Sequence, residues 1–313
     1  MSYGWPLKPF NQQHPVRAFF GDPRIGKPLG GSSFHNGIDI SAADGTAVFA
    51  VAPGKVSLGG AFNVAVVSPD GVEHGYEHLQ PAVKSGDQVA QGALLGHILM
   101  PAPGSDWKHV HFSECHPQGT YWNPLRQGAL TPFAKTTAPS VTHIAVERGG
   151  QALNPNALSG LVDLVAEVHD VTPIDPPPPW NDYPVTPAFV SWRLVANAAM
   201  VVPWQTVADF RTSLQLRTFV TTTADPAYGI QVGASCDVGW EKVYAPGTGQ
   251  NNLPPHPGAP PEPGHFRFKL AAGFDTSAHP DESYRLDVQA TDIHGNASTG
   301  HLVLVLANHS GQV

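Results

Sequence analysis

Hydrophobic and polar residues alternate in short runs along the chain, and glycine, proline or aspartate closes each run. Between residues 20 and 124 the runs include "GIDISA", "VAVVSP" and "ALLGHIL", separated by the turn sequences "ADGT", "SPDG" and "SGD". A period of two residues is typical of strands with one buried face, and no helical period of any length occurs. This part of the chain is therefore predicted to be all-β.

The same pattern resumes after residue 140. The segment "SYRLDVQATDIHGNASTGHLVLVLA" alternates on both sides of "IHGN", which predicts a hairpin with a Gly/Asn turn. Two proline-rich inserts, 172–187 and 245–264, cannot lie in central strands and are expected as surface loops. We expect one β-sandwich with two long loops.

A chain of 313 residues is long for one core, so two domains are expected. We place the first domain at 1–130, with an extended lead-in over residues 1–20. Residues 131–140 are polar and contain proline, which suits a linker. The sandwich then covers 141–313.

Charge excludes some functions. Only 13% of residues are charged and the net charge is −8, of which −1 lies in residues 1–130 and −7 in 131–313. Nucleic-acid binding needs clustered Lys and Arg, so it is not expected. No apolar run has the length of a membrane span, and the N-terminus shows no secretory signal. Cys115 and Cys236 are expected as lone buried thiols rather than a disulfide.

Two segments, "KHVHFSECHPQ" and "FHNGIDI", contain candidate metal-binding and catalytic residues. In a strand, His109 and His111 face the same way, about 7 Å apart. In a straight strand His35 and Asp39 would be about 13 Å apart, too far to share one ion. Asn36-Gly37 is a strong turn former, however, and a bend there can bring them together.

A third segment, "HGYEHL", offers two further histidines. Nothing local selects His78 over His74. Alternation places Glu77 and Glu114 away from the histidines next to them, so both are expected to be solvated surface charges.

His35, Asp39 and His111 together supply two imidazoles and one carboxylate. This donor set is typical of a catalytic zinc site with three protein ligands and an open position for water. A neutral histidine nearby can act as general base, a role open to His78 and His109.

The ordered motifs "FGDPR", "FHNGIDI", "GTAVFAVAPGKV", "GYEHL", "VKSGDQVAQGALLGHI", "HVHF" and "YWNPL" resemble the lysostaphin-type (LytM-like) zinc endopeptidases over residues 20 to 125. The resemblance implies an antiparallel β-sheet peptidase domain and one zinc ion per chain. It also implies cleavage of peptide cross-links in bacterial peptidoglycan, and an extracellular or cell-wall location.

Carried over by position, the resemblance implies that His35, Asp39 and His111 hold the metal. His109 and His78 would line the site and assist the water and the transition state. His74 matches no motif position and is expected at the surface. The resemblance also implies structural roles, in turns and strands, for Gly86, Asp87, Val89 and Gly92.

Two departures from the family pattern bear on function. The chain reads "PAPGSDWK" where the family has a Gly-rich loop ending in Gly-Pro, which borders the substrate groove. Ser113 precedes Glu114 where the family has Glu directly after His-Phe. Two alternatives to cell-wall hydrolysis therefore stay open: a non-catalytic binding or regulatory protein on the peptidase scaffold, and a peptidase acting on other flexible peptides.

The C-terminal half resembles bacterial immunoglobulin-like domains in its closing hairpin, a generic match that identifies no ligand. It is expected to be a spacer or stabilising partner, with wall targeting or substrate gating as the alternative. Trp180 and Tyr183 either present an aromatic surface to a partner or pack on the sandwich. Asp287, Asp292 and Asn296 fit no calcium-loop spacing, and we assign no metal to them.

Overall fold

The computed structural model describes residues 2–25, 32–99, 108–117, 119–215, 221–224, 231–233, 240–251 and 262–309. Within these ranges the protein is built almost wholly from antiparallel strands, with one four-residue helix, α1 (Trp240–Val243), and one 3-10 turn, Thr276–Ala278. The all-β prediction is confirmed. The "PAPGSDWK" loop up to Trp107, and Cys236, lie outside the described residues.

The N-terminal half is organised around one large sheet, whose order is β1-β4-β12-β8-β7-β6-β10. Its strands are β1 (Val16–Ala18), β4 (Ile38–Ser41), β6 (Gly54–Leu58), β7 (Asn63–Val67), β8 (Glu73–Glu77), β10 (Gln88–Val89) and β12 (His109–His116). Alternation explains the buried face: Val64 and Val66 of β7 are buried, while the other three residues of the strand are half-buried. The central strand β12 is buried on both faces as far as Glu114. Val110 and Phe112 lie on its apolar face, and His109 and His111 lie on the other.

Smaller sheets lie beside this one. The sheet β5-β11-β9 consists of β5 (Ala47–Phe49), β9 (Leu79–Pro81) and β11 (Leu94–Ile98), and β2 (Pro23–Ile25) pairs with β3 (Ser32–Phe34). A further pair joins β20 (Thr221–Ala224) to β21 (Gln231–Gly233).

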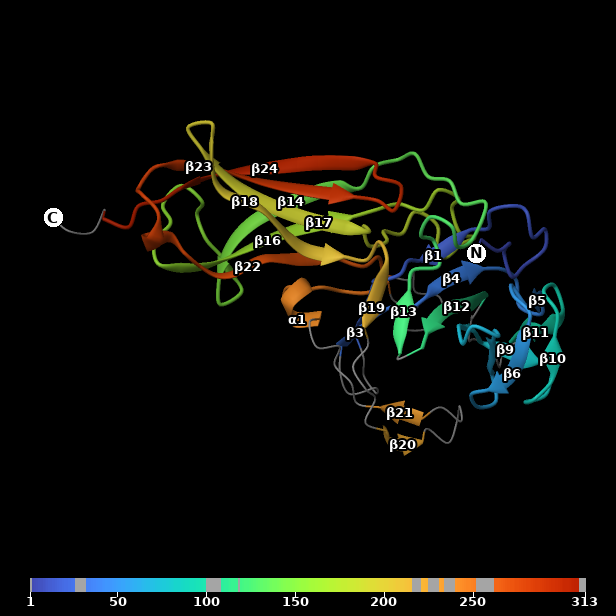
Figure 1. Cartoon of the computed structure of the whole chain (residues 1–313). Coiled ribbons are helices and arrows are strands. Elements are labelled where there is room, and N and C mark those ends of the chain that lie inside the picture. The colour runs from blue at the N-terminus through green and yellow to red at the C-terminus, as the bar shows by residue number, and fades with distance from the viewer. Residues whose placement is uncertain are drawn as a thin grey trace.

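The C-terminal half contains two four-stranded antiparallel sheets, β15-β14-β16-β22 and β18-β17-β23-β24, which pack together as a sandwich (Figure 1). Their strands are β14 (Ser140–Arg148), β15 (Gln151–Ala152), β16 (Leu161–His169), β17 (Phe189–Ala196), β18 (Ala199–Asp209), β22 (Arg267–Asp275), β23 (Ser283–Thr291) and β24 (Ala297–Val305). The predicted hairpin is β23–β24, with Asp292 N–H donating to Asn296 O at 3.0 Å across the turn. The immunoglobulin-like resemblance of this half stays a prediction.

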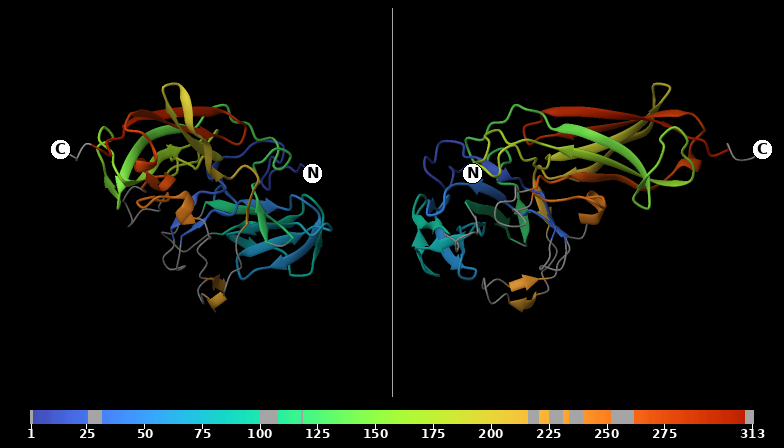
Figure 2. Two further views of the ribbon diagram at one scale, coloured as in Figure 1. Left: turned by 60° about the vertical axis from the view of Figure 1, so that its left-hand side comes forward. Right: turned by 180° about the vertical axis from the view of Figure 1, so that it is seen from behind.

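The two halves share a sheet. Strand β13 (Thr120–Trp122) pairs with β12 on one side and with β19 (Ser213–Gln215), from the C-terminal half, on the other. In both views of Figure 2 the sandwich lies against the blue and cyan N-terminal strands. One continuous cluster of buried apolar residues runs through both halves.

The lead-in and the linker are more firmly packed than their sequences predict. Tyr3, Trp5 and Leu7 are buried, and the Trp5 indole donates to Pro132 O at 2.8 Å. Lys135 is 6% exposed, and its ammonium lies 2.8 Å from Asp170 Oδ1 and 3.5 Å from Asp292 Oδ2. The lead-in is thus part of the core. The division into domains at residues 130 and 140 stays a prediction.

Within the described ranges, no helix has the length and apolar character to cross a bilayer.

Candidate metal centre

Strand register places Asp39 and His111 side by side. Strands β4 and β12 pair antiparallel with Asp39 opposite His111 and Ser41 opposite His109. Directly opposed residues have Cβ atoms about 4.5–5.5 Å apart on the same face. His35 follows β3, and the Asn36-Gly37 turn before β4 folds its imidazole back over Asp39, as the sequence predicts.

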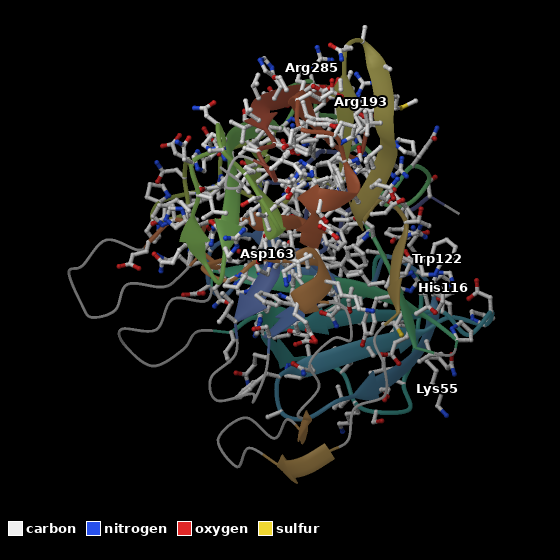
Figure 3. All side chains as sticks on the ribbon, turned by 90° about the vertical axis from the view of Figure 1, so that its left-hand side faces the viewer. Lys55, His116, Trp122, Asp163, Arg193 and Arg285 are labelled. Atoms are coloured by element: carbon white, nitrogen blue, oxygen red, sulfur yellow. The ribbon has the colours of Figure 1, made fainter. Side chains whose placement is uncertain are left out.

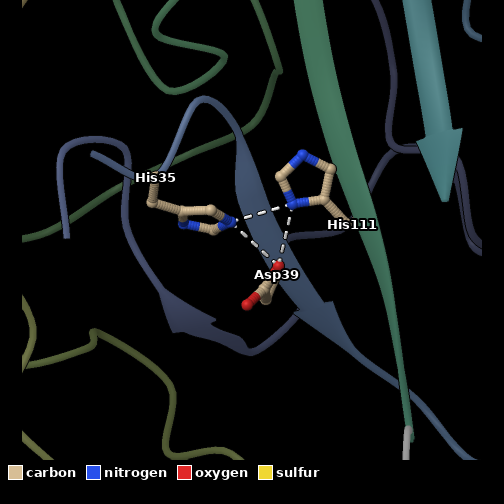
Figure 4. Close-up of side chains that lie close together, drawn as sticks. All are labelled: His35, Asp39 and His111. Atoms are coloured by element: carbon tan, nitrogen blue, oxygen red, sulfur yellow. Dashed lines mark hydrogen bonds and ion pairs between the residues drawn. The ribbon is translucent and has the colours of Figure 1, made fainter. Parts of the chain in front are cut away.

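Three atoms that can bind a metal converge at this point (Figure 4). His35 Nε2 lies 2.8 Å from His111 Nδ1 and 3.0 Å from Asp39 Oδ1, and His111 Nδ1 lies 3.1 Å from the same oxygen. Ligands on a tetrahedral zinc ion at about 2.0–2.1 Å are spaced about 3.3 Å apart. The triangle therefore has nearly the size that zinc requires, and the donor set fits this metal.

The His35 ring is oriented by its second nitrogen. Nδ1–H donates to Phe19 O at 2.9 Å, which leaves the Nε2 lone pair facing Asp39. A ring nitrogen that donates to a carbonyl fixes the tautomer of a ligating histidine. His111 presents Nδ1 to the site. Its buried Nε2 has no hydrogen-bond partner in the described part of the chain.

Charge and burial set the protonation of His35 and Asp39, whereas for His111 the effect of burial is outweighed by the hydrogen bond to Asp39, which raises the imidazole pKa. Burial lowers the pKa of His35 to about 4, with the Arg24 guanidinium acting in the same direction. Burial opposes ionisation of Asp39, but the imidazoles of His35 and His109 hold the pKa of its carboxyl well below the usual value. At neutral pH the site thus offers an ionised carboxylate and a neutral His35 imidazole.

Gly37 is required by close packing. A Cβ at this position would lie 2.4 Å from Phe112 O and 2.7 Å from His111 Nε2. Any side chain would push the His111 ring away from the triangle, so the Asn-Gly turn serves both the bend and the approach of β12.

His109 and His78 lie next to the three converging atoms. His109 is buried, with Nε2 3.7 Å from Asp39 Oδ1, and its ring centroid is 4.7 Å from that of His78. Burial lowers the pKa of His78 to about 3, which keeps that ring neutral. Two imidazoles beside three possible ligands can exchange a proton or hydrogen-bond a substrate oxygen.

The site opens into a cavity of about 760 Å³. Arg17, Arg24, Asn36 and Glu77 line it from the N-terminal half, as do the five predicted site residues. Both proline-rich inserts contribute as well: Trp180 comes from the first, and Gln250, Asn251 and Glu262 from the second. The sequence predicted these inserts only as surface loops.

Two sequence expectations were wrong, and one residue expected on the surface lines the cavity. Glu114 is 3% exposed, faces away from the cavity, and accepts from Arg126 Nη2 at 2.6 Å. His74 is 5% exposed and packs edge-on against Tyr3, with ring centroids 5.4 Å apart. Both residues are covered by Tyr3, which lies far away in the sequence. Glu77 is half-buried and lines the cavity.

Residues around Glu114 form a polar network on the far face of β12. Tyr3 donates to the carboxylate, and His116 Nε2 lies 2.7 Å from Glu114 Oε1. The His116 ring stacks on Trp122 with centroids 4.2 Å apart, and the two side chains lie side by side in Figure 3. This network ties the lead-in to β12 and lies on the opposite face of that strand from His109 and His111.

The other residues considered in the sequence contact neighbouring side chains or backbone groups of the fold. Trp180 is buried, with the Arg17 guanidinium 4.4 Å from its ring centroid and Tyr183 edge-on at 5.9 Å. Arg193 and Arg285, close together in Figure 3, both bind the carboxylate of Asp287. Asp292 caps its own turn by accepting from His294 and Asn296 N–H. The Cys115 thiol is free and half-buried.

Sequence reasoning missed Arg24. Its Nη2 donates to Asp39 Oδ2 at 3.0 Å. The similarity of "FGDPR" to a family segment marked the position, but nothing local links it to a carboxylate 15 residues away. The residues of the proline-rich inserts had no local signal at all.

Comparison with known proteins agrees with this geometry. Residues 33–124 match the model of peptidase family M23. No curated protein matches the chain.

Similar solved structures include three bacterial peptidases or related proteins. The catalytic domain of lysostaphin from Staphylococcus simulans is 24% identical, with a TM-score of 0.25, 31% of this chain covered and 76% of that one. A zinc-containing peptidase from Vibrio cholerae is 21% identical, with a TM-score of 0.30 and 36% of each chain covered. Csd3 from Helicobacter pylori is 22% identical, with a TM-score of 0.29, covering 43% of this chain and 38% of that one.

The family model and the ordered motifs coincide in the matched segment. That segment contains His35, Asp39, His78, His109 and His111. Residues 33–124 belong to peptidase family M23.

Proposed function

We propose that the protein is a zinc-dependent endopeptidase that hydrolyses peptide cross-links of bacterial peptidoglycan. The observation that carries the proposal is the triangle of His35 Nε2, Asp39 Oδ1 and His111 Nδ1, with sides of 2.8–3.1 Å, at the wall of an open cavity. Such a cavity suits an extended, flexible peptide. The proposed place of action is outside the cell or at the cell wall.

His35, Asp39 and His111 would hold the ion. Zinc bound there supplies Lewis acidity and a water of lowered pKa. His109, buried beside the carboxylate, would accept a proton during hydrolysis and return it to the leaving amine. His78 donates a hydrogen bond that orients the substrate oxygen as charge develops on it.

Arg24 and Asp39 act together in this scheme. The guanidinium occupies Oδ2 of the carboxylate, which leaves Oδ1 facing the two imidazoles. The carboxylate is thereby held in one orientation before any ligand arrives, and this lowers the reorganisation needed for binding.

A turbidity assay on purified cell walls tests the proposal. We expect clearing by the full chain, loss of clearing with a chelator, and recovery on adding zinc. The His111→Ala variant should not clear the suspension. Clearing by that variant at the wild-type rate would remove the metal site from the mechanism.

Two other functions remain as outcomes of the test. A chain that binds walls without clearing them, with or without zinc, is a binding or regulatory protein on the peptidase scaffold. A chain that leaves walls untouched but cleaves defined flexible peptides acts on another substrate. Mass spectrometry of the products identifies the cleaved bond in either enzyme.

A further inference from the structure

The turn between β1 and β2 holds His35 at three points. Besides the bond from the ring Nδ1 to Phe19 O, Gly21 N–H donates to His35 O at 2.8 Å and His35 N–H donates to Asp22 O at 2.8 Å. Both the backbone and the ring of this proposed ligand thus depend on where residues 19–22 lie.

The C-terminal half holds that turn in place. Asp22 Oδ1 accepts from Thr186 N–H at 2.7 Å, and its Oδ2 accepts from Phe19 N–H at 2.9 Å. The Tyr244 hydroxyl donates to Gly21 O at 2.8 Å and lies 3.1 Å from the Thr186 hydroxyl. Asp22, Thr186 and Tyr244 are each at most 2% exposed, so water does not compete for these bonds.

Packing at the same place is tight. Gly21 has φ +91°, and a Cβ there would lie 2.5 Å from the Phe210 ring. Phe34, directly before His35, packs on Phe210 and Tyr244 with ring centroids 5.4 and 5.9 Å away. The His35 segment is therefore enclosed by the C-terminal half on its backbone side.

We propose that Asp22 and Tyr244 are positioning residues through which the C-terminal half sets the orientation of His35 and hence the zinc affinity of the site. The path runs from Thr186 N–H and the Tyr244 hydroxyl to Asp22 and Gly21, then to Phe19 O and the His35 ring. This inference rests on the proposed function. It gives the C-terminal half a part in the metal centre beyond that of a spacer.

Removing the group that hydrogen-bonds a metal-binding histidine typically lowers metal affinity 10- to 100-fold. Asp22→Asn keeps the shape but replaces one acceptor oxygen with an NH₂ that faces a backbone N–H. Tyr244→Phe removes only the hydroxyl. Zinc affinity is measured on the full chain by competition with a chromogenic chelator, and the visible spectrum of the cobalt-loaded protein reports ligand geometry.

Matched control variants lie in the sandwich. The Tyr284 hydroxyl donates to Pro280 O at 2.9 Å in a buried side chain, and Asp292 Oδ1 accepts two backbone N–H bonds at 2.9 Å. Tyr284→Phe and Asp292→Asn should lower the melting temperature of the metal-free protein as the test variants do. They should leave zinc affinity and the cobalt spectrum unchanged.

We expect Asp22→Asn and Tyr244→Phe each to weaken zinc binding about 10-fold or more and to shift the cobalt spectrum. If either folded variant binds zinc as tightly as the wild type, the inference is overturned while the proposed function stands. A wild-type chain that takes up no zinc removes both. The two test variants change different groups. If one of them fails to fold, the zinc affinity of the other still tests the inference.

Discussion

Arg24 donates to Asp39 Oδ2 at 3.0 Å, while the imidazoles of His35 and His111 face Oδ1 of the same carboxylate. The two carboxylate oxygens of Asp39 therefore have different partners. One is anchored by a cation of the chain, and the other is presented to the place where a metal would bind.

Arg24→Lys should weaken zinc binding by about 10-fold, because lysine keeps the positive charge but loses the planar guanidinium that reaches Oδ2. Chelator competition measures the change. Arg211→Lys, which alters an exposed pair with Asp209 at 2.6 Å, is the control and should leave affinity unchanged. Equal affinity in the Arg24 and Arg211 variants would show that the carboxylate needs no anchor.

His109→Ala and His111→Ala should separate catalysis from metal binding. His111→Ala is expected to lose zinc, whereas His109→Ala should retain it and lose about 10²- to 10⁴-fold in kcat, the usual contribution of a general base. Metal analysis and hydrolysis of a cross-link peptide are run on the same preparations. A His109→Ala enzyme with the wild-type rate would require another proton acceptor, for which Glu77 is placed in the same cavity.

Lys135→Met should destabilise the fold by about 3–5 kcal/mol, because it leaves the buried carboxylates of Asp170 and Asp292 without their cation. Urea unfolding of the metal-free protein measures the free energy of unfolding. Lys55→Met, at an exposed position, is the control and should change it little. A small effect at both positions would mean that water already reaches the two carboxylates.

Trp180→Ala should raise KM for a peptide substrate by about 2- to 10-fold with little change in kcat, because the indole supports Arg17 at the wall of the cavity. Trp204→Ala is the matched control. Its ring also supports an arginine, Arg193 at 4.7 Å, but it lies on β18 of the sandwich. A rise in KM of the same size in both variants would place substrate binding elsewhere.

The strands and the bend before β4 were predictable because their signals are local. Alternation identified β7, β12 and the β23–β24 hairpin, and the Asn-Gly turn predicted the bend that carries His35 to Asp39. The family motifs selected His78 over His74 where local chemistry could not.

Burial of single polar residues was not predictable. Glu114 and His74 are covered by Tyr3, more than 70 residues earlier in the chain, so alternation alone placed them at the surface. The cavity wall was missed for the same reason, because Trp180, Gln250, Asn251 and Glu262 reach it from the distant proline-rich inserts. The contacts that hold the turn beside His35 are equally distant in sequence. Thr186 contacts Asp22 across 164 residues, and Tyr244 contacts Gly21 across 223.

The pairing of β13 with β19 bears on how this molecule can be divided or recombined. A fragment ending near residue 130 would carry an unpaired edge at β13 and a bare apolar surface around Phe34, which invites aggregation. Transplanting the N-terminal half onto a foreign partner would thus fail unless the new partner brought a replacement for β19. Engineered truncations and chimaeras should keep residues 120–122 and 213–215 in one polypeptide.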